Sequence, residues 1–355
     1  MQEEQHGDGC NLIGAIDREL SIKCLVRLSR SEYGTVASLS RDFWSLVRSG
    51  EIYRVRRLAG VVEHWIYLDI NLESWTAYDP DRERWIQVPK MPKDELLSGH
   101  PQKESLAVGT NLLVFVDDVQ RSLFGLFRYT PSFPKSMQFP RILFGSASVG
   151  HKAYLAGGRD HYGRVLSSAE IYDCEKKDWA LLPSMNRARA ECSGVFMDGK
   201  LYVIGGRGSK REPLACGEDY DFKQGSWRVI ENMTRGLNIR MSNHVPPRFA
   251  VVNNELYGVD YIETNVKKYD KQNNRWITLG RWPESIASTK NGRGIGFIAL
   301  ERQLIIIGHQ GTLNMPKFEL YPWVPDGRPP VWNLIARPHF RMLRNLHCDA
   351  AVMSC

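Results

Sequence analysis

The sequence predicts an all-β propeller of six blades over residues 61–355, preceded by a small all-α domain at residues 13–60 and a flexible tail at residues 1–12. Two observations carry this prediction. One is a spacing, a Tyr-Asp pair with a tryptophan seven positions after the tyrosine, which occurs four times in the longer segment. The other is a change of pattern near residue 60, where apolar residues at helical spacing give way to short runs typical of strands.

The longer segment repeats with a period of about 50 residues. Each unit contains short apolar runs rich in β-branched and aromatic residues, which indicate strands rather than helices. Four antiparallel strands per unit make a propeller blade, so six units predict six blades. The tyrosines that end the third run of each unit lie between 43 and 52 residues apart, at Tyr78, Tyr129, Tyr172, Tyr220, Tyr269 and Tyr321.

The repeated spacing predicts a hairpin between strands three and four of each unit. The tyrosine closes strand three and the tryptophan begins strand four beside it, so both rings can pack between neighbouring blades. Glycine pairs at the end of strand two permit positive φ and a close backbone approach. The residues with these structural roles are Tyr78, Trp85, Gly157, Gly158, Tyr172, Trp179, Gly205, Gly206, Tyr220, Trp227, Tyr269 and Trp276.

The two ends of the repeat region predict how the ring closes. The first unit begins at residues 65–69 with no small-residue strand before it, while residues 348–355 resemble the first strand of another unit, residues 192–199. We therefore expect residues 346–355 to supply the missing strand of blade one and protect its edge. Deleting the last ten residues should unfold the ring.

Three units depart from the pattern. The second lacks a tryptophan after Tyr129, so we expect blade two to be thin. The fifth lacks the glycine pair, and the sixth keeps only Gly308 and delays its tryptophan to Trp332.

The segment at residues 13–60 indicates three short helices. Asp17 is a candidate N-cap of the first, and Ser29 with Glu32 forms a candidate capping box for the second. So small a domain buries little apolar surface, and we expect it to rest on a partner or on the propeller. The first helix carries apolar residues at helical spacing at Leu20, Cys24, Leu25 and Leu28.

These motifs resemble two known families. The double glycine followed by Tyr-Asp and tryptophan resembles the kelch repeat. The segments ELSIKCLVRL, SLSRDFWSLVRS and GEIYRVRRLAG resemble an F-box, although Ile16-Asp17 stands where that family usually has Leu-Pro. An F-box followed by kelch repeats is similar to the plant F-box/kelch proteins.

The resemblance implies a non-catalytic substrate-recognition subunit of a Skp-cullin-F-box ubiquitin ligase, active in the cytoplasm, the nucleus or both. The helical domain would bind a Skp-type adaptor and through it a cullin, while the propeller would bind a target protein. The adaptor-binding residues implied are Ile16, Asp17, Leu20, Cys24, Leu25, Leu28 and Trp44.

Target binding is expected at one end of the propeller. In kelch propellers the loops that join strand two to strand three, and strand four to the next blade, line one face. Here these loops carry arginines suited to the carboxylates of an acidic peptide, although polar surface loops alone would also explain them. The arginines are Arg141, Arg159, Arg164, Arg187, Arg189, Arg207 and Arg211.

Composition and motifs argue against other classes of function. Net charge is +7 but no block of basic residues appears, so we expect no nucleic-acid partner, and no apolar run approaches the roughly 20 residues that span a bilayer. The seven cysteines contain no CxxC pair, which favours a reducing compartment. The nine histidines show no metal-ligand spacing, so we expect no metal and no cofactor. Two alternatives stay open, a non-degradative interaction scaffold with a weakened F-box and, more remotely, a metal-dependent kelch enzyme.

Overall fold

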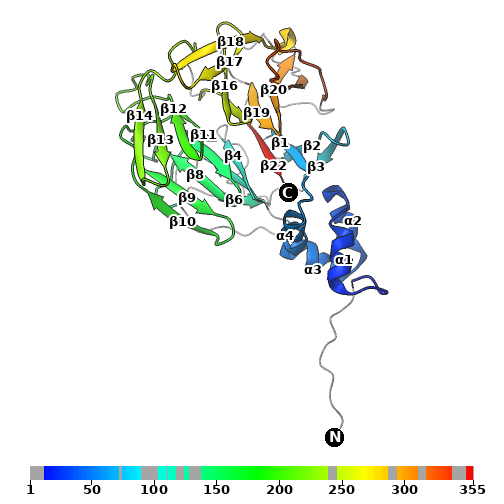
Figure 1. Cartoon of the computed structure of the whole chain (residues 1–355). Helices are drawn as coiled ribbons and strands as arrows, with labels where there is room; N and C mark the ends of the chain where they lie inside the picture. Colours follow the sequence, from blue (N-terminus) through cyan, green and yellow to red (C-terminus); the bar gives the residue numbers. More distant parts are fainter. Residues whose placement is uncertain are drawn as a thin grey trace. The chain divides into compact units, whose positions relative to one another are not determined.

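The computed structural model describes residues 12–71, 74–88, 103–109, 111–116, 124–127, 137–238, 246–286, 294–310, 317–337 and 349–354. The chain divides into two compact units, one formed mainly by Met1–His64 and the other by Trp65–Phe127 and Pro131–Met353. The first contains helices and the second contains small antiparallel sheets (Figure 1). No helix in the described ranges is long and apolar enough to cross a membrane.

The helical unit has four α-helices within its described residues, where three were predicted. They are α1 (Arg18–Leu25), α2 (Tyr33–Leu39), α3 (Arg41–Ser49) and α4 (Glu51–Leu58), with the 3-10 helix η1 (Arg30–Glu32) before α2. The expected third helix is split because Gly50 ends α3 in the left-handed conformation, with φ of 79°. Asp17 is the N-cap of α1, as predicted, and Ser29 caps η1 through the N–H of Ser31.

A buried arginine ties this small unit together. Arg56 is 0% exposed, and its Nη1 donates to the carbonyl oxygens of Val26 at 2.7 Å and Leu28 at 2.5 Å and to the hydroxyl of Tyr33 at 3.0 Å. Glu63 lies 3.4 Å from Arg56 Nη2 and compensates its charge. The apolar core around this network consists of Ile22, Leu25, Val26, Tyr33, Val36, Leu46, Val47 and Ile52.

The second unit is a β-propeller whose described residues form six sheets, four of four strands and two of three. The sheet orders are β22-β1-β2-β3, β4-β5-β6, β10-β9-β8-β7, β11-β12-β13-β14, β15-β16-β17-β18 and β19-β20-β21. The strand bounds are β1 His64–Asn71, β2 Ser74–Asp79, β3 Arg84–Gln87, β4 Lys103–Val108, β5 Asn111–Val116, β6 Phe124–Phe127, β7 Gly145–Val149, β8 Lys152–Ala156, β9 Ala169–Asp173, β10 Asp178–Leu182, β11 Ser193–Met197, β12 Lys200–Ile204, β13 Gly217–Asp221, β14 Ser226–Ile230, β15 Phe249–Val252, β16 Glu255–Asp260, β17 Asn265–Asp270, β18 Arg275–Arg281, β19 Gly296–Leu300, β20 Gln303–Gln310, β21 Lys317–Trp323 and β22 Asp349–Ser354.

The predicted hairpin register is confirmed at all four repeats of the Tyr-Trp spacing. Tyr172 lies directly opposite Trp179 across β9 and β10, and their ring centroids are 4.9 Å apart. The same cross-strand pairing places Tyr220 opposite Trp227 in the next sheet, with centroids 5.1 Å apart. The other two pairs are Tyr269 with Trp276 at 5.3 Å and Tyr78 with Trp85 at 5.0 Å.

Each ring pair packs against the preceding sheet. Tyr172 and Trp179 belong to one buried cluster with Leu113 and Phe115 of β5. In the same way Tyr78 and Trp85 of the first sheet pack in one cluster with residues of β19, β20 and β21, the three-stranded sheet that precedes β22 along the chain. The first and last sheets therefore meet, as a closed ring requires.

The C-terminal strand belongs to the first sheet. Strand β22 is the neighbour of β1, so the sheet contains both ends of the propeller sequence. Its buried side chains are Ala351 and Met353, which are 6% and 4% exposed. The chain end thus occupies the edge that β1 would otherwise leave open.

The sixth unit positions its tryptophan without a described fourth strand. In the sixth unit the indole of Trp332 donates to the carbonyl of Arg281 at 2.9 Å, although no fourth strand is present among the described residues. Trp227 and Trp276 make the same type of bond, to Pro183 at 2.7 Å and Met233 at 2.8 Å. Trp332 therefore makes the same indole-to-carbonyl hydrogen bond as Trp227 and Trp276, although it does not lie on a described fourth strand. Tyr129 of the second unit lies outside the described residues.

Candidate protein-binding surfaces

The first helix presents a stripe of apolar side chains to solvent. Leu20, Cys24 and Leu28 lie four residues apart, so they share one side of α1 and of the turn that follows it. Leu20 and Leu28 are 46% and 39% exposed, and Cys24 is also exposed. All three belong to the predicted adaptor-binding set.

Leu25 is the one predicted adaptor contact that the structure places in the core, and this prediction is wrong. It is 7% exposed and packs with Ile22 and Val26. The reason is helical phase: with 3.6 residues per turn, a residue five positions after Leu20 points well away from it. Leu25 therefore stabilises the helical unit.

Two further apolar side chains are exposed where α2 ends and α3 begins. Leu39 and Trp44 are 67% and 48% exposed, and the guanidinium of Arg48 lies 4.5 Å from the Trp44 ring centre. Trp44 was predicted as an adaptor contact, whereas Leu39 was not. Its signal in the sequence was an apolar residue immediately before the cap Ser40.

Ile16-Asp17 stands where the F-box family usually has Leu-Pro. Asp17 Oδ1 accepts a hydrogen bond from the Leu20 N–H at 2.7 Å, which starts α1 at Arg18. Ile16 is half-buried, and its N–H donates to Ile13. A proline would favour the start of a helix at this position. Here the Asp17 side chain, as the N-cap, starts the helix instead.

At one end of the propeller, the loops of the third and fourth sheets are joined backbone to backbone. Within the third unit Ile142 and Arg159 exchange two hydrogen bonds, and within the fourth unit Ala190 and Arg207 do the same. The Gly158 N–H also donates to Arg189 across the two sheets at 2.7 Å. The loops at this end, which we name the loop face, form one connected surface of residues 139–144, 157–168, 183–192 and 205–216.

The glycine pairs make this connection possible. Gly157 and Gly158 have φ of 72° and 98°, and Gly205 and Gly206 have 68° and 95°. A Cβ on Gly158 would lie only 2.7 Å from the Ile142 carbonyl oxygen. The pairs thus have the positive φ and the close approach expected from the sequence.

Arg141 and Arg189 were predicted to bind a target, and the structure contradicts this for both. Their side chains are 0% exposed, and each Nη2 donates to a buried glutamate at 2.7 Å, Glu170 and Glu218 respectively. Arg189 Nη1 also donates to two backbone carbonyls, of Gly205 and Cys216, both at 3.0 Å. These guanidinium groups hold the loop face together from inside and cannot reach a partner.

The partners Glu170 and Glu218 were missed. Each also accepts two backbone N–H groups of the segment that leads into its own sheet, for example those of Asn186 at 2.7 Å and Arg187 at 3.0 Å on Glu218. The signal was a glutamate two residues before the repeat tyrosine, which recurs at Glu319 before Tyr321. A glutamate on a strand that is expected to be buried predicts a buried cation, because a buried carboxylate needs a partner.

Arg159 and Arg207 occupy equivalent positions after the two glycine pairs and share one carboxylate. Glu191 is 2% exposed and lies 3.6 Å from Arg159 and 3.2 Å from Arg207. Both arginine side chains keep part of their surface accessible, 15% and 27%. Two cations around one buried acid leave this part of the loop face positively charged.

The other three predicted arginines are exposed, and one of them has an aromatic neighbour. Arg164 stands over the exposed ring of Tyr162 at 5.0 Å, and its Nε donates to Asp160 at 2.6 Å. Asp160 Oδ1 also accepts the N–H groups of both residues, which orders the loop. The three arginines are Arg164, Arg187, which pairs with Glu231, and Arg211.

Known proteins with similar sequences are F-box/kelch-repeat proteins of Arabidopsis thaliana. SKIP11 is 47% identical over 361 residues, covering 98% of this chain and 76% of SKIP11. At1g26930 is 43% identical over 362 residues, covering 98% and 84% of the two chains. The chain belongs to the F-box/kelch-repeat protein family. The Kelch motif itself matches residues 140–186 and 188–234.

The two matched Kelch motifs are the third and fourth units, which build the loop face. They carry the glycine pairs, the buried Arg-Glu pairs and the shared Glu191. In this F-box/kelch-repeat protein the most regular repeats therefore also carry the charged residues of the loop face. The fifth unit replaces the glycine pair by a short turn held by Asp260.

The described part of this F-box/kelch-repeat protein offers no cluster of three or more His, Cys, Asp or Glu side chains placed to hold a metal ion. Cys192 lies between the third and fourth sheets, and burial raises its pKa to about 12. Its thiol is therefore protonated at neutral pH and a poor nucleophile. The surfaces described here suit binding.

Proposed function

We propose that this F-box/kelch-repeat protein is the substrate-recognition subunit of a Skp-cullin-F-box ubiquitin ligase. Residues 13–60 form the F-box that binds a Skp-type adaptor, and the propeller binds a target protein. The observation that carries this proposal is the combination of a helical unit exposing apolar side chains with a propeller exposing a charged loop face. Whole-length similarity to F-box/kelch-repeat proteins supports it.

The adaptor surface consists of the exposed apolar side chains on one side of α1 and the turn after it, together with those at the junction of α2 and α3. Exposed leucines and tryptophans in a unit this small mark a surface that a partner covers, since burying them removes apolar area from water. Ile16 and Asp17 position the start of α1 at the edge of this surface. The adaptor contacts are Leu20, Cys24, Leu28, Leu39 and Trp44.

The target surface is the loop face. Tyr162 and the Arg164 side chain are each 72% exposed there, and such aromatic and arginine side chains often dominate binding energy. Asp160 orders their loop before binding, which lowers the entropic cost of recognition. With Arg159, Arg207 and Arg211 nearby on equivalent loops, the surface suits an acidic segment of a target protein.

The propeller that holds this surface has six blades. One cavity at its centre is lined by residues of β4, β7, β11, β15, β19 and β22, one strand from each sheet. Each of these strands lies at one end of its sheet, as the innermost strand of a blade does. This arrangement supports a ring in which β22 completes blade one.

No residue of the chain performs covalent chemistry in this proposal. The propeller holds the target while the F-box attaches it to the ligase, so target lysines reach a high effective concentration near the conjugating enzyme. The chain therefore raises the rate of ubiquitin transfer only by positioning the target.

Binding of the purified full-length chain to a Skp-type adaptor tests the F-box assignment. Leu20→Asp should abolish binding because it places a charge in the apolar contact. Leu58→Asp is the matched control, since Leu58 is 75% exposed on α4 and outside the proposed contacts. Leu25→Asp is unsuitable because Leu25 is in the core. No binding by the intact chain would reject the assignment and favour a non-degradative scaffold.

A further inference from the structure

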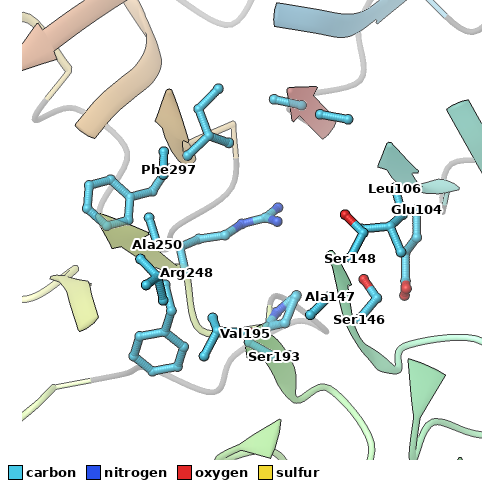
Figure 2. Close-up of a pocket in the computed structure, with 18 of the residues that line it drawn as sticks. Glu104, Leu106, Ser146, Ala147, Ser148, Ser193, Val195, Arg248, Ala250 and Phe297 are labelled. Atoms are coloured by element: carbon cyan, nitrogen blue, oxygen red, sulfur yellow. The ribbon is translucent and has the colours of Figure 1, made fainter. Parts of the chain in front are cut away.

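The cavity at the centre of the propeller has two unlike walls. Its volume is about 390 Å³. One wall, from β4, β7 and the start of β11, is polar and includes Glu104, Ser146 and Ser148 (Figure 2). The opposite wall, from β15, β19 and β22, is apolar and includes Val251, Ile298 and Val352. A molecule that fits both walls has a polar end and an apolar body.

Arg248 lies between the two walls. Figure 2 shows its side chain extending from the start of β15 toward the middle of the cavity. Three other sheets have buried apolar residues at the position before their inner strand, Phe144, Cys192 and Ile295. The fold accepts an apolar residue at this position in those sheets, so the cation is particular to the fifth unit, where its side chain also interacts with the buried hydroxyl of Tyr261.

The serines add hydrogen-bond donors beside this cation. Ser146 and Ser148 alternate along β7 with buried Ala147, so both side chains lie on the half-exposed face of the strand. In Figure 2 the Ser146 and Ser148 side chains lie across the cavity from Arg248. The Ser193 hydroxyl has a different role, since it donates to the carbonyl of Pro247.

Glu104 restricts the charge of the ligand. Its carboxylate is on the polar wall, and a second negative group on the ligand would be repelled by it. One anionic group directed at Arg248 is compatible with both charges.

We propose that the central cavity binds a small amphipathic organic monoanion, with its carboxylate at Arg248 and the β7 serines and its apolar body against Val251, Ile298 and Val352. This site shares no residue with the adaptor surface, and only Phe144 and Cys192 of the loop face line it. It depends on the propeller alone, so it stands or falls independently of ligase membership.

Calorimetric titration of the purified full chain with 3-phenylpropionate tests the proposal. The matched neutral probe is 3-phenylpropanamide, which has nearly the same shape without the charge. We expect saturable 1:1 binding of the anion, and binding of the amide weaker by at least about tenfold, because an ionised hydrogen-bond partner is lost.

Three substitutions separate this site from unspecific binding. Arg248→Gln should weaken anion binding at least about tenfold, whereas Glu104→Gln should strengthen it several-fold because a like charge is removed. Ser148→Leu should weaken binding of both probes because it removes a hydrogen-bond donor and narrows the cavity. Thermal unfolding of each variant verifies folding, and the opposite signs at Arg248 and Glu104 cannot arise from destabilisation.

The proposal is overturned if the intact chain shows no saturable binding up to the solubility limit of the anion. It is equally overturned if the anion and the amide bind alike, if Glu104→Gln weakens anion binding, or if folded Ser148→Leu still binds with unchanged affinity.

Discussion

Single buried residues hold the loop face in shape. Arg189, in the segment between β10 and β11, donates to Glu218 of β13 and to the carbonyls at both ends of the loop between β12 and β13. It therefore links this segment to two strands of the fourth sheet. Arg141 makes the same bonds to Glu170, Gly157 and Ser168. A buried charge without its partner is costly, and these pairs therefore matter for stability more than for contact with a target.

Replacing Arg189 by methionine should lower the free energy of unfolding by about 3–5 kcal/mol, because Glu218 stays buried without its cation. Denaturant unfolding followed by fluorescence measures the change. Arg211→Met is the matched control on an exposed loop position and should stay within about 0.5 kcal/mol of the parent. Equal stability of the two variants would contradict the structural role of Arg189.

Asp260 makes stability depend on pH in a defined direction. Burial alone would raise its pKa, but hydrogen bonds from the Glu263 N–H, Lys267 and the Asn238 N–H outweigh burial and hold the pKa below its usual value. A depressed pKa gives stability that is complete above the unfolded-state pKa of about 3.9 and is lost as pH falls through the folded-state pKa.

Asp260→Asn should therefore lower the free energy of unfolding by about 2 kcal/mol near neutral pH, since charged hydrogen bonds are lost. Urea unfolding of parent and variant should give the same gap at about pH 7 and pH 5 and a smaller gap below about pH 4. A gap that widens on acidification would show that the carboxylate does not stabilise the fold.

Residue burial was the hardest property to predict. Arg141 and Arg189 stand in polar loop sequences, as exposed Arg164 does. Nothing in the loop sequence itself distinguishes a buried arginine that supports the fold from an exposed arginine that can bind a partner. The distinguishing signal is distant in the sequence: a glutamate two residues before the repeat tyrosine, some 30 residues later. Leu20 and Leu25 lie on different sides of α1, and packing against the other helices decides which side is buried.

At the scale of elements, the hairpins were predictable because their cause is local. A seven-residue separation leaves room for one turn and places Tyr172 directly opposite Trp179. The helices were less predictable, since Gly50 ends α3 by backbone conformation within a continuous amphipathic pattern. Trp332 was visible as a displaced tryptophan, but its bond to Arg281 depends on the path of the loop.

Removing β22 tests closure of the ring. Deleting residues 346–355 should expose the edge of β1 and lower the unfolding temperature by more than 10 °C, or cause aggregation, because Ala351 and Met353 also leave the core. Thermal unfolding with size-exclusion chromatography detects either result. A matched point variant, Met353→Ala, should be destabilised but monomeric. An unchanged unfolding temperature after deletion would show that β22 is dispensable.

At the scale of the whole molecule, the chain combines two compact units with different surfaces. The helical unit exposes leucines and a tryptophan, and the propeller exposes arginines and Tyr162 on its loop face. The repeat period and the change of pattern near residue 60 are properties of the whole sequence, so this organisation could be predicted from it. Which loop residues remain accessible depends on contacts between blades and required the structure.

If these two surfaces bind different partners, quantitative proximity labelling in cells with the proteasome blocked will separate the two sets of labelled proteins. Full-length chains carrying Leu20→Asp, or Tyr162→Ala with Arg164→Glu, are compared with the parent, and Lys223→Glu serves as a charge control outside the loop face. We predict that the helix variant loses the Skp-type adaptor and keeps its other labelled proteins, whereas the loop variant keeps the adaptor and loses them. If either folded variant loses both sets of partners, or if both variants keep both sets, the assignment of two separate binding surfaces is wrong.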